Sequence, residues 1–276
     1  MSTLLLLEHL IDDAALFPPG NAPMVSAVAG HRMVKAGPVG WLVGRFLCPA
    51  SRIGELRAQL QPADTFALGL IGDTGVSGLP AALAAVEEDP RLILLAVELV
   101  PPAGDLVSSV RQALDVLPDD VRGYVELPRQ PDWLAALAVV GAAQRSAKLR
   151  TGGAIAGAFP SEREVADFLL ACAVAAVPFK CTAGLHNAVR HTDPETGFEH
   201  HGFVNIALAA CAAVRGEDPE PVLAERDAPR LTAAVRSLDD ATVTRARTLY
   251  AGFGSCSVGV PAGDLLDLGL LDGGPA

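Results

Sequence analysis

Short aliphatic runs alternate with longer Ala- and Leu-rich segments of helical period from about residue 41 onward. This alternation is typical of successive strand–helix units around a parallel sheet. We expect strands at residues 41–47, 65–71, 92–99, 123–127, 147–151 and 178–182, and weaker ones at 221–225 and 255–258. Eight units in 276 residues predict a (β/α)8, TIM-type barrel. A doubly wound parallel sheet is the alternative, because the last two strands are weak.

The first forty residues follow a different pattern and predict an N-terminal helical extension. Two helices are expected there, at residues 4–17 and 24–35, joined by Pro18-Pro19-Gly20-Asn21. Further along, a capping box at Ser161 and Glu164 predicts a helix over residues 165–176. Half of all residues are hydrophobic and no low-complexity run suggests a linker, so we expect one domain over residues 1–276.

Composition excludes several function classes. A net charge of −11 would repel a phosphate backbone, so nucleic acid is not an expected partner. The chain has no run of about 18 apolar residues, and acidic residues interrupt the apolar run at residues 4–7. We therefore expect a cytoplasmic protein without a membrane partner, which could form a homo-oligomer. Five cysteines without CxxC spacing are expected to be reduced thiols.

Two of only three lysines, Lys148 and Lys180, lie inside apolar strand-like runs. In a parallel barrel, alternate strand residues point inward and chemistry gathers at the carboxyl ends of the strands. Charged or polar residues occupy these ends on five of the predicted strands: Arg45, Glu98, Glu126, Lys148, Arg150, Lys180 and Thr182. Unpaired buried charges are costly, so we expect these side chains to pair with one another as a polar cluster inside the barrel.

Residues 180–184, Lys-Cys-Thr-Ala-Gly, resemble the Lys-Thr-Ser-Thr-Gly strand of the deoxyribose-phosphate aldolase family. Residues 147–153, Ala-Lys-Leu-Arg-Thr-Gly-Gly, are similar to that family's second lysine strand, which there follows the first and here precedes it. The resemblance implies a class I aldolase barrel in which Lys180 forms a Schiff base. The residues themselves leave two alternatives open: Lys180 clamps an anionic substrate, or it fills the lumen as the partner of Glu98 or Glu126.

An unusually polar loop, residues 184–203, separates the sixth predicted strand from a helix at 203–215. It contains four of the six histidines, namely His186, His191, His200 and His201. We expect this loop to cover the barrel mouth, with His186 as a general acid or base. Alternatively, the four histidines with Glu98 or Glu126 bind a divalent metal such as zinc, although no motif of fixed geometry is present. No cofactor is favoured.

Together, these features predict an enzyme acting on a small anionic, carbonyl-containing metabolite through a lyase or aldolase-type reaction. Lys180, His186, Glu126 and Glu98 are the predicted catalytic residues. The predicted substrate-binding residues are Arg45, Lys148, Arg150, Thr182, Asn205, Ser255 and Ser257. Two alternatives remain open: a metal-dependent hydrolase or isomerase that uses the histidine loop, and a barrel that binds a metabolite without catalysis.

Overall fold

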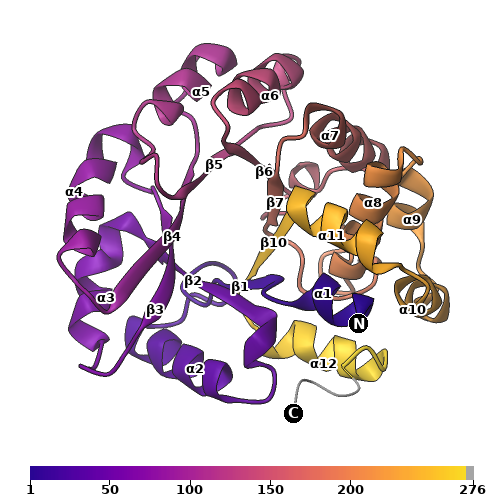
Figure 1. Cartoon of the computed structure of the whole chain (residues 1–276), viewed down its shortest axis with the longest axis horizontal. Helices are drawn as coiled ribbons and strands as arrows, with labels where there is room; N and C mark the ends of the chain where they lie inside the picture. Colours follow the sequence, from indigo (N-terminus) through magenta and orange to yellow (C-terminus); the bar gives the residue numbers. More distant parts are fainter. Residues whose placement is uncertain (272–276) are drawn as a thin grey trace.

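Eight parallel strands close into a barrel in the computed structural model, which describes residues 1–271 (Figure 1). The strands are β1 (Ile11–Asp13), β2 (Val43–Pro49), β3 (Phe66–Ile71), β4 (Leu92–Leu99), β5 (Arg122–Glu126), β6 (Ser146–Arg150), β7 (Phe179–Thr182) and β10 (Tyr250–Ser255). Their order around the barrel is β1-β10-β7-β6-β5-β4-β3-β2. This topology confirms the (β/α)8 prediction, and the doubly wound alternative is wrong.

Helices surround the strands, and their apolar faces pack on the outward-facing strand residues (Figure 1). They are α1 (Ser2–Leu7), α2 (Met24–Ala36), α3 (Ile53–Gln59), α4 (Gly75–Glu87), α5 (Leu106–Leu114), α6 (Trp133–Ala142), α7 (Glu162–Ala175), α8 (Phe203–Arg215), α9 (Glu220–Ala224), α10 (Ala228–Arg236), α11 (Asp240–Leu249) and α12 (Gly259–Asp267). Helix α7 begins with the predicted capping box of Ser161 and Glu164. Within the described residues, no helix has the length and apolar character that a bilayer crossing requires.

The first barrel strand lies where a helix was predicted. Helix α1 ends at Leu7, and residues 11–13 form β1 between β10 and β2. Ile11 pairs with Phe253 on one side and with Val43 on the other. A three-residue strand is too short to show the period of two that marks a strand in a sequence. The N-terminal segment is therefore part of the barrel wall as well as a helical extension.

The last two predicted strands also differ from the structure. Residues 221–224 of the predicted strand at 221–225 fall on helix α9, where Pro221 occupies the first turn, a position that tolerates proline. The eighth strand is β10, which ends at Ser255, where the predicted strand began. Its sequence, Tyr-Ala-Gly-Phe-Gly-Ser, has few of the residues that favour strands. Gly252 is required there, because a Cβ atom at this position would lie 2.3 Å from the Leu10 carbonyl oxygen.

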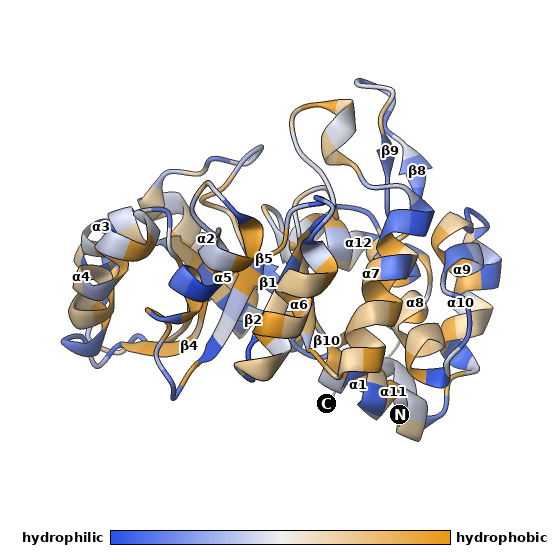
Figure 2. Cartoon of the chain, turned by 90° about the horizontal axis from the view of Figure 1, so that it is seen from above, coloured by the Kyte–Doolittle hydropathy of each residue, from blue (hydrophilic) through white to orange (hydrophobic). Residues whose placement is uncertain are grey.

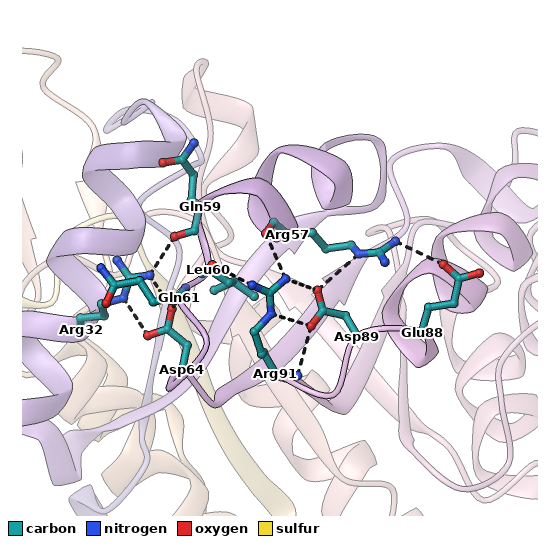
Figure 3. A network of polar contacts seen from close by, with 9 residues as sticks. All are labelled: Arg32, Arg57, Gln59, Leu60, Gln61, Asp64, Glu88, Asp89 and Arg91. Atoms are coloured by element: carbon teal, nitrogen blue, oxygen red, sulfur yellow. Dashed lines mark hydrogen bonds and ion pairs between the residues drawn. The ribbon is translucent and has the colours of Figure 1, made fainter.

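A network of ion pairs joins the segments that lead into β3 and β4, at the amino ends of these strands (Figure 3). Arg32 on α2 binds Asp64 with both its Nε and Nη2 atoms, at 2.8 and 2.5 Å. Asp89 accepts from Arg91 at 2.6 Å and from Arg57 at 3.4 Å. These contacts fix the end of the barrel opposite to the one where barrel enzymes carry their active sites.

A two-stranded hairpin, β8 (His191–Thr192) and β9 (Glu199–His200), belongs to the loop between β7 and α8. It projects on the side of the molecule opposite to the N-terminus (Figure 2). This loop follows the carboxyl end of β7, so the hairpin lies on the same side of the barrel as the mouth.

Candidate active site

Seven charged side chains form one continuous series of contacts inside the barrel, which we call the interior charged cluster. In order of contact they are Arg45, Asp12, Lys180, Glu98, Lys148, Glu126 and Arg150. They come from β2, β1, β7, β4, β6, β5 and β6. Strands β4 and β7 are not neighbours in the sheet, so the contact between Glu98 and Lys180 crosses the lumen. Cations and carboxylates alternate along the cluster, and one positive charge remains unmatched.

Glu98 bridges the two lysines. Its Oε1 atom lies 2.5 Å from Lys180 Nζ, and its Oε2 atom lies 3.0 Å from Lys148 Nζ. Each lysine has a second carboxylate partner: Asp12 Oδ2 lies 2.6 Å from Lys180 Nζ, and Glu126 Oε2 lies 3.2 Å from Lys148 Nζ. Lys148 and Lys180 are register partners on adjacent strands, which places both amines at one level of the barrel.

Asp12, Glu98 and Lys148 stay ionised because the neighbouring charges outweigh the cost of burial. Burial alone would raise the pKa of Glu98, but Lys180 and Lys148 lower it from 4.5 to about 2. Burial opposes the charged form of Asp12 too, and Arg45 and Lys180 hold the pKa of that carboxyl well below its usual value. Lys148 is disfavoured as a cation by burial, yet Glu98 and Glu126 raise its pKa. Asp12 and Glu98 are therefore carboxylates at neutral pH, and Lys148 is a cation.

Sequence reasoning missed two members of this site, Asp12 and Tyr124. Asp12 accepts from Arg45 Nε at 3.0 Å and Nη2 at 2.7 Å, but it lies in the strand that was predicted as helix. The Tyr124 ring is fully buried, and the Arg45 guanidinium carbon and Lys180 Nζ lie 5.3 and 5.6 Å from its centre. The period of two, which places Tyr124 on the same face as Glu126, was the available signal.

Arg150 and Thr182 end β6 and β7 and are register partners at the barrel mouth. Arg150 Nε lies 2.9 Å from Glu126 Oε1, and 49% of the arginine side chain is exposed. The loops beyond them are tied together, because the Thr151 hydroxyl donates to the Ala183 carbonyl oxygen at 2.6 Å. This rim of the mouth is thus held by hydrogen bonds between the two strand ends.

His186 lies at the mouth and pairs with Cys256 rather than with the interior charged cluster. Its Nδ1 atom is 3.7 Å from Cys256 Sγ, and both side chains are half-buried. Burial, together with His200 and His191, lowers the pKa of His186. The imidazole is therefore neutral at pH 7 and able to accept a proton.

The four loop histidines do not form one ligand set. The rings of His191 and His200 lie 5.2 Å apart across the hairpin. His201 is fully buried and occupied at both nitrogens, with Arg190 Nη1 at 3.3 Å and the Pro160 carbonyl oxygen at 2.8 Å. Among residues 1–271, no three His, Cys, Asp or Glu side chains are placed as a metal site would require. The structure thus offers no ligand set for the alternative metal site.

Three predicted substrate-binding residues have other partners. The Asn205 amide accepts from Arg190 N at 2.9 Å and donates to the Val222 and Glu225 carbonyl oxygens, each at 2.8 Å. Asn205 therefore holds the segment around α9 instead of facing the mouth. The buried Ser255 hydroxyl donates to the Ser257 carbonyl oxygen at 2.7 Å, and Ser257 Oγ accepts from Val260 N. These two serines shape the turn into α12.

Lys148, Lys180, Glu98, Glu126, Arg45 and Arg150 are thus brought together as predicted, with Thr182 beside them. Comparisons of the chain with protein-family models, with curated proteins and with solved structures gave no match in any of the three. We therefore infer the function of the protein from the site alone.

Proposed function

We propose that this barrel is an enzyme that forms a Schiff base with a small anionic, carbonyl-containing metabolite in a lyase or aldolase-type reaction. One observation carries the proposal: Lys148 and Lys180 lie in register on adjacent strands, and Glu98 bridges their amines. A surface lysine is solvated, whereas these two amines are buried among fixed carboxylates. Such perturbed, interconnected groups inside a barrel are typical of a functional site.

The carboxylates of the cluster would stabilise the positive charge of an iminium ion. The Lys148 ammonium, whose pKa is raised, must first pass a proton to a base, and the neutral amine then adds to the carbonyl carbon. The proton returns when water leaves, so the protonated imine has the same single positive charge as the original ammonium. Carboxylates that lie 3.0 and 3.2 Å from Lys148 Nζ would therefore remain paired after the adduct forms. The iminium then accepts the electron pair of the breaking carbon–carbon bond and becomes an enamine, while the leaving fragment's hydroxyl loses its proton to a base.

Among the predicted catalytic groups, His186 is the most suitable proton carrier. The lowered pKa values of Glu98 and Glu126 make these carboxylates weak bases. His186 has a pKa below its ordinary value of 6.5 and lies in the loop after β7, four residues beyond Thr182. Glu98 and Glu126 would then stabilise positive charge, and His186 would move protons at the mouth.

Exposure distinguishes the two amines. The Lys180 side chain is 0% exposed and lies between two carboxylates at 2.5 and 2.6 Å. Lys148 is 6% exposed and has the longer contacts. In the proposed reaction, Lys148 is accordingly the amine that forms the imine. Lys180, which the sequence predicted for this role, keeps Glu98 in place.

Borohydride reduction tests the proposal, because it converts a Schiff base into a stable secondary amine. The purified protein would be incubated with a panel of small aldehydes and oxo acids, reduced, and its adduct located by peptide mass spectrometry. The only other lysine, Lys35, lies outside the cluster and donates to the carbonyl oxygens of Gly40 and Val43, so it is an internal control. We expect the adduct on Lys148.

Two variants test which of the two lysines forms the adduct. Lys148→Met should abolish the adduct, whereas Lys180→Met should slow its formation, because Glu98 loses one of its two partners. Far-ultraviolet circular dichroism would confirm that both variants fold. An adduct on Lys180 would exchange the two roles. An adduct confined to Lys35 or the N-terminal amine, or none with any member of the panel, would refute Schiff-base chemistry.

A further inference from the structure

We infer that the substrate is a short-chain oxo acid whose carboxylate is bound by Arg150 while its carbonyl group reaches Lys148. The inference extends the proposed function, on which it rests, by naming the anionic group and the residue that selects it. Three features support it: the unmatched charge of the interior cluster, the free edge of Arg150, and the distance between Arg150 and Lys148.

The interior charged cluster has one cation more than it has carboxylates, and its most exposed member lies at the mouth. Four cations and three carboxylates alternate through the interior charged cluster, and Arg150 is its last member on the open side. Arg247, a further cation nearby, donates to the Glu8 and Tyr250 carbonyl oxygens at the amino ends of β1 and β10. It is thus placed at the opposite end of the barrel. A single excess charge at the mouth is matched by a monoanion such as a carboxylate.

Within residues 1–271, one edge of the Arg150 guanidinium contacts a carboxylate and the other edge has no partner. Its Nε and Nη2 atoms face Glu126, at 2.9 and 3.5 Å from the two carboxylate oxygens. The edge formed by Nη1 and Nη2 can receive a planar carboxylate through two parallel hydrogen bonds. The contact with Glu126, on the inner side of the barrel, already restrains the guanidinium, so the side chain loses less rotational freedom when a ligand binds.

The rim around Arg150 is fixed before any ligand arrives. Thr151 N donates to the Thr182 carbonyl oxygen at 2.9 Å, and the Thr151 hydroxyl donates to that of Ala183. Gly152 and Gly184 approach so closely that a Cβ atom at Gly152 would lie 2.7 Å from the Gly184 Cα atom. Arg150 and its register partner Thr182 therefore stand on a rigid base, as a preorganised binding site requires.

Spacing limits the size of the substrate. Arg150 follows Lys148 by two residues on one strand, which separates their Cα atoms by roughly 7 Å and points both side chains to the same face. A molecule that meets both must hold its carboxylate and carbonyl carbons within about that span. Short oxo acids meet this limit, and so does pyruvate, as the fragment that keeps the imine after the carbon–carbon bond breaks. A phosphorylated aldehyde would bring close to two negative charges to a cluster with one unmatched cation.

The test compares reductive trapping of pyruvate with that of acetaldehyde, which lacks the carboxylate. The readout is the ratio of the two trapping rates in the same protein, so a general loss of folding or of amine reactivity cancels. We expect the ratio to fall on the order of ten- to hundredfold in Arg150→Gln, because this substitution removes a charge-assisted bidentate contact with the carboxylate. Arg150→Lys should retain part of the preference for pyruvate, because lysine keeps the positive charge but lacks the planar guanidinium.

Arg163→Gln is the matched control. Arg163 on α7 is exposed to a similar extent, 43%, and is paired with Asp167, but it lies outside the interior charged cluster. Its substitution should leave the ratio unchanged. The inference is wrong if Arg150→Gln has the same ratio as the wild type, or if glycolaldehyde phosphate is trapped faster than pyruvate.

A binding measurement separates this inference from the proposed function. Propanoate and propanamide have no reactive carbonyl, so calorimetric titration with each reports carboxylate recognition without an imine. If no compound is trapped but propanoate binds more tightly than propanamide, and Arg150→Gln removes that difference, the Schiff base is refuted and the carboxylate site stands. Equal affinity for both compounds would overturn the carboxylate site itself.

Discussion

At the scale of single residues, Glu98 has the greatest influence on the interior charged cluster. Its two oxygens each hold one lysine, and both lysines are buried. Removing one partner of a buried ion pair leaves an uncompensated charge, which costs far more than an exposed pair is worth. The position of Glu98 was predictable from its place at the end of an apolar strand. Its bridging role was not, because that depends on strands β6 and β7 meeting β4 across the lumen.

Glu98→Gln should lower the free energy of unfolding by about 3–5 kcal/mol, because an amide cannot neutralise two ammonium groups. Urea denaturation followed by circular dichroism would measure the change. The exposed Glu55, paired with Arg52 on the surface, provides the control, and Glu55→Gln should leave the midpoint unchanged. A loss below about 1 kcal/mol in Glu98→Gln would mean that solvent reaches the two lysines and screens them.

At the scale of elements, predictability followed strand length and composition. The six central strands were recognised because each has at least four residues, includes aliphatic or aromatic residues, and adjoins a longer segment of helical period. Strand β1 has three residues and β10 contains Gly252 and Gly254, so neither has a local signal that separates it from a loop or a helix. Both become strands because each completes the hydrogen bonding of the other. Asp12 was lost from the predicted site for the same reason.

Gly252→Ala should destabilise the protein by about 2 kcal/mol or more. Its φ of 138° is a conformation that L-residues rarely adopt, and a methyl group there would collide with the Leu10 carbonyl oxygen. Gly263 is the matched control, since it lies within α12 and a Cβ atom there meets nothing within 4 Å. Gly263→Ala should raise stability by roughly 0.5–1 kcal/mol. Thermal unfolding of both variants would check this contrast, and equal effects would contradict it.

At the scale of the whole molecule, the interior charged cluster makes folding depend on pH. Asp12, Glu98 and Glu126 each have a lowered pKa in the folded protein. A carboxyl group whose pKa is lower in the folded state binds protons more readily when the protein is unfolded. Its contribution to the free energy of unfolding is therefore complete above the unfolded pKa and is lost as pH falls toward the folded pKa. For Glu98 this window extends from 4.5 down to about 2.

The free energy of unfolding should therefore decrease steadily as pH falls from about 4.5 toward 2. Urea midpoints measured at several pH values across this range would follow the loss. Glu98→Gln lacks one of the three titrating groups and should show a shallower dependence than the wild type. Parallel curves for the two proteins would show that Glu98 does not contribute to the acid sensitivity.

The pairing of Ile11 with Phe253 joins segments 242 positions apart in the chain, and it is the contact that closes the barrel. Until β10 forms, β1 can pair only with β2, and β7 keeps an open edge on its other side. Contacts of such long range are slow to form and leave strand edges exposed to other molecules. Refolding should thus pass through a stage in which the sheet is still open, and aggregation competes with closure at that stage.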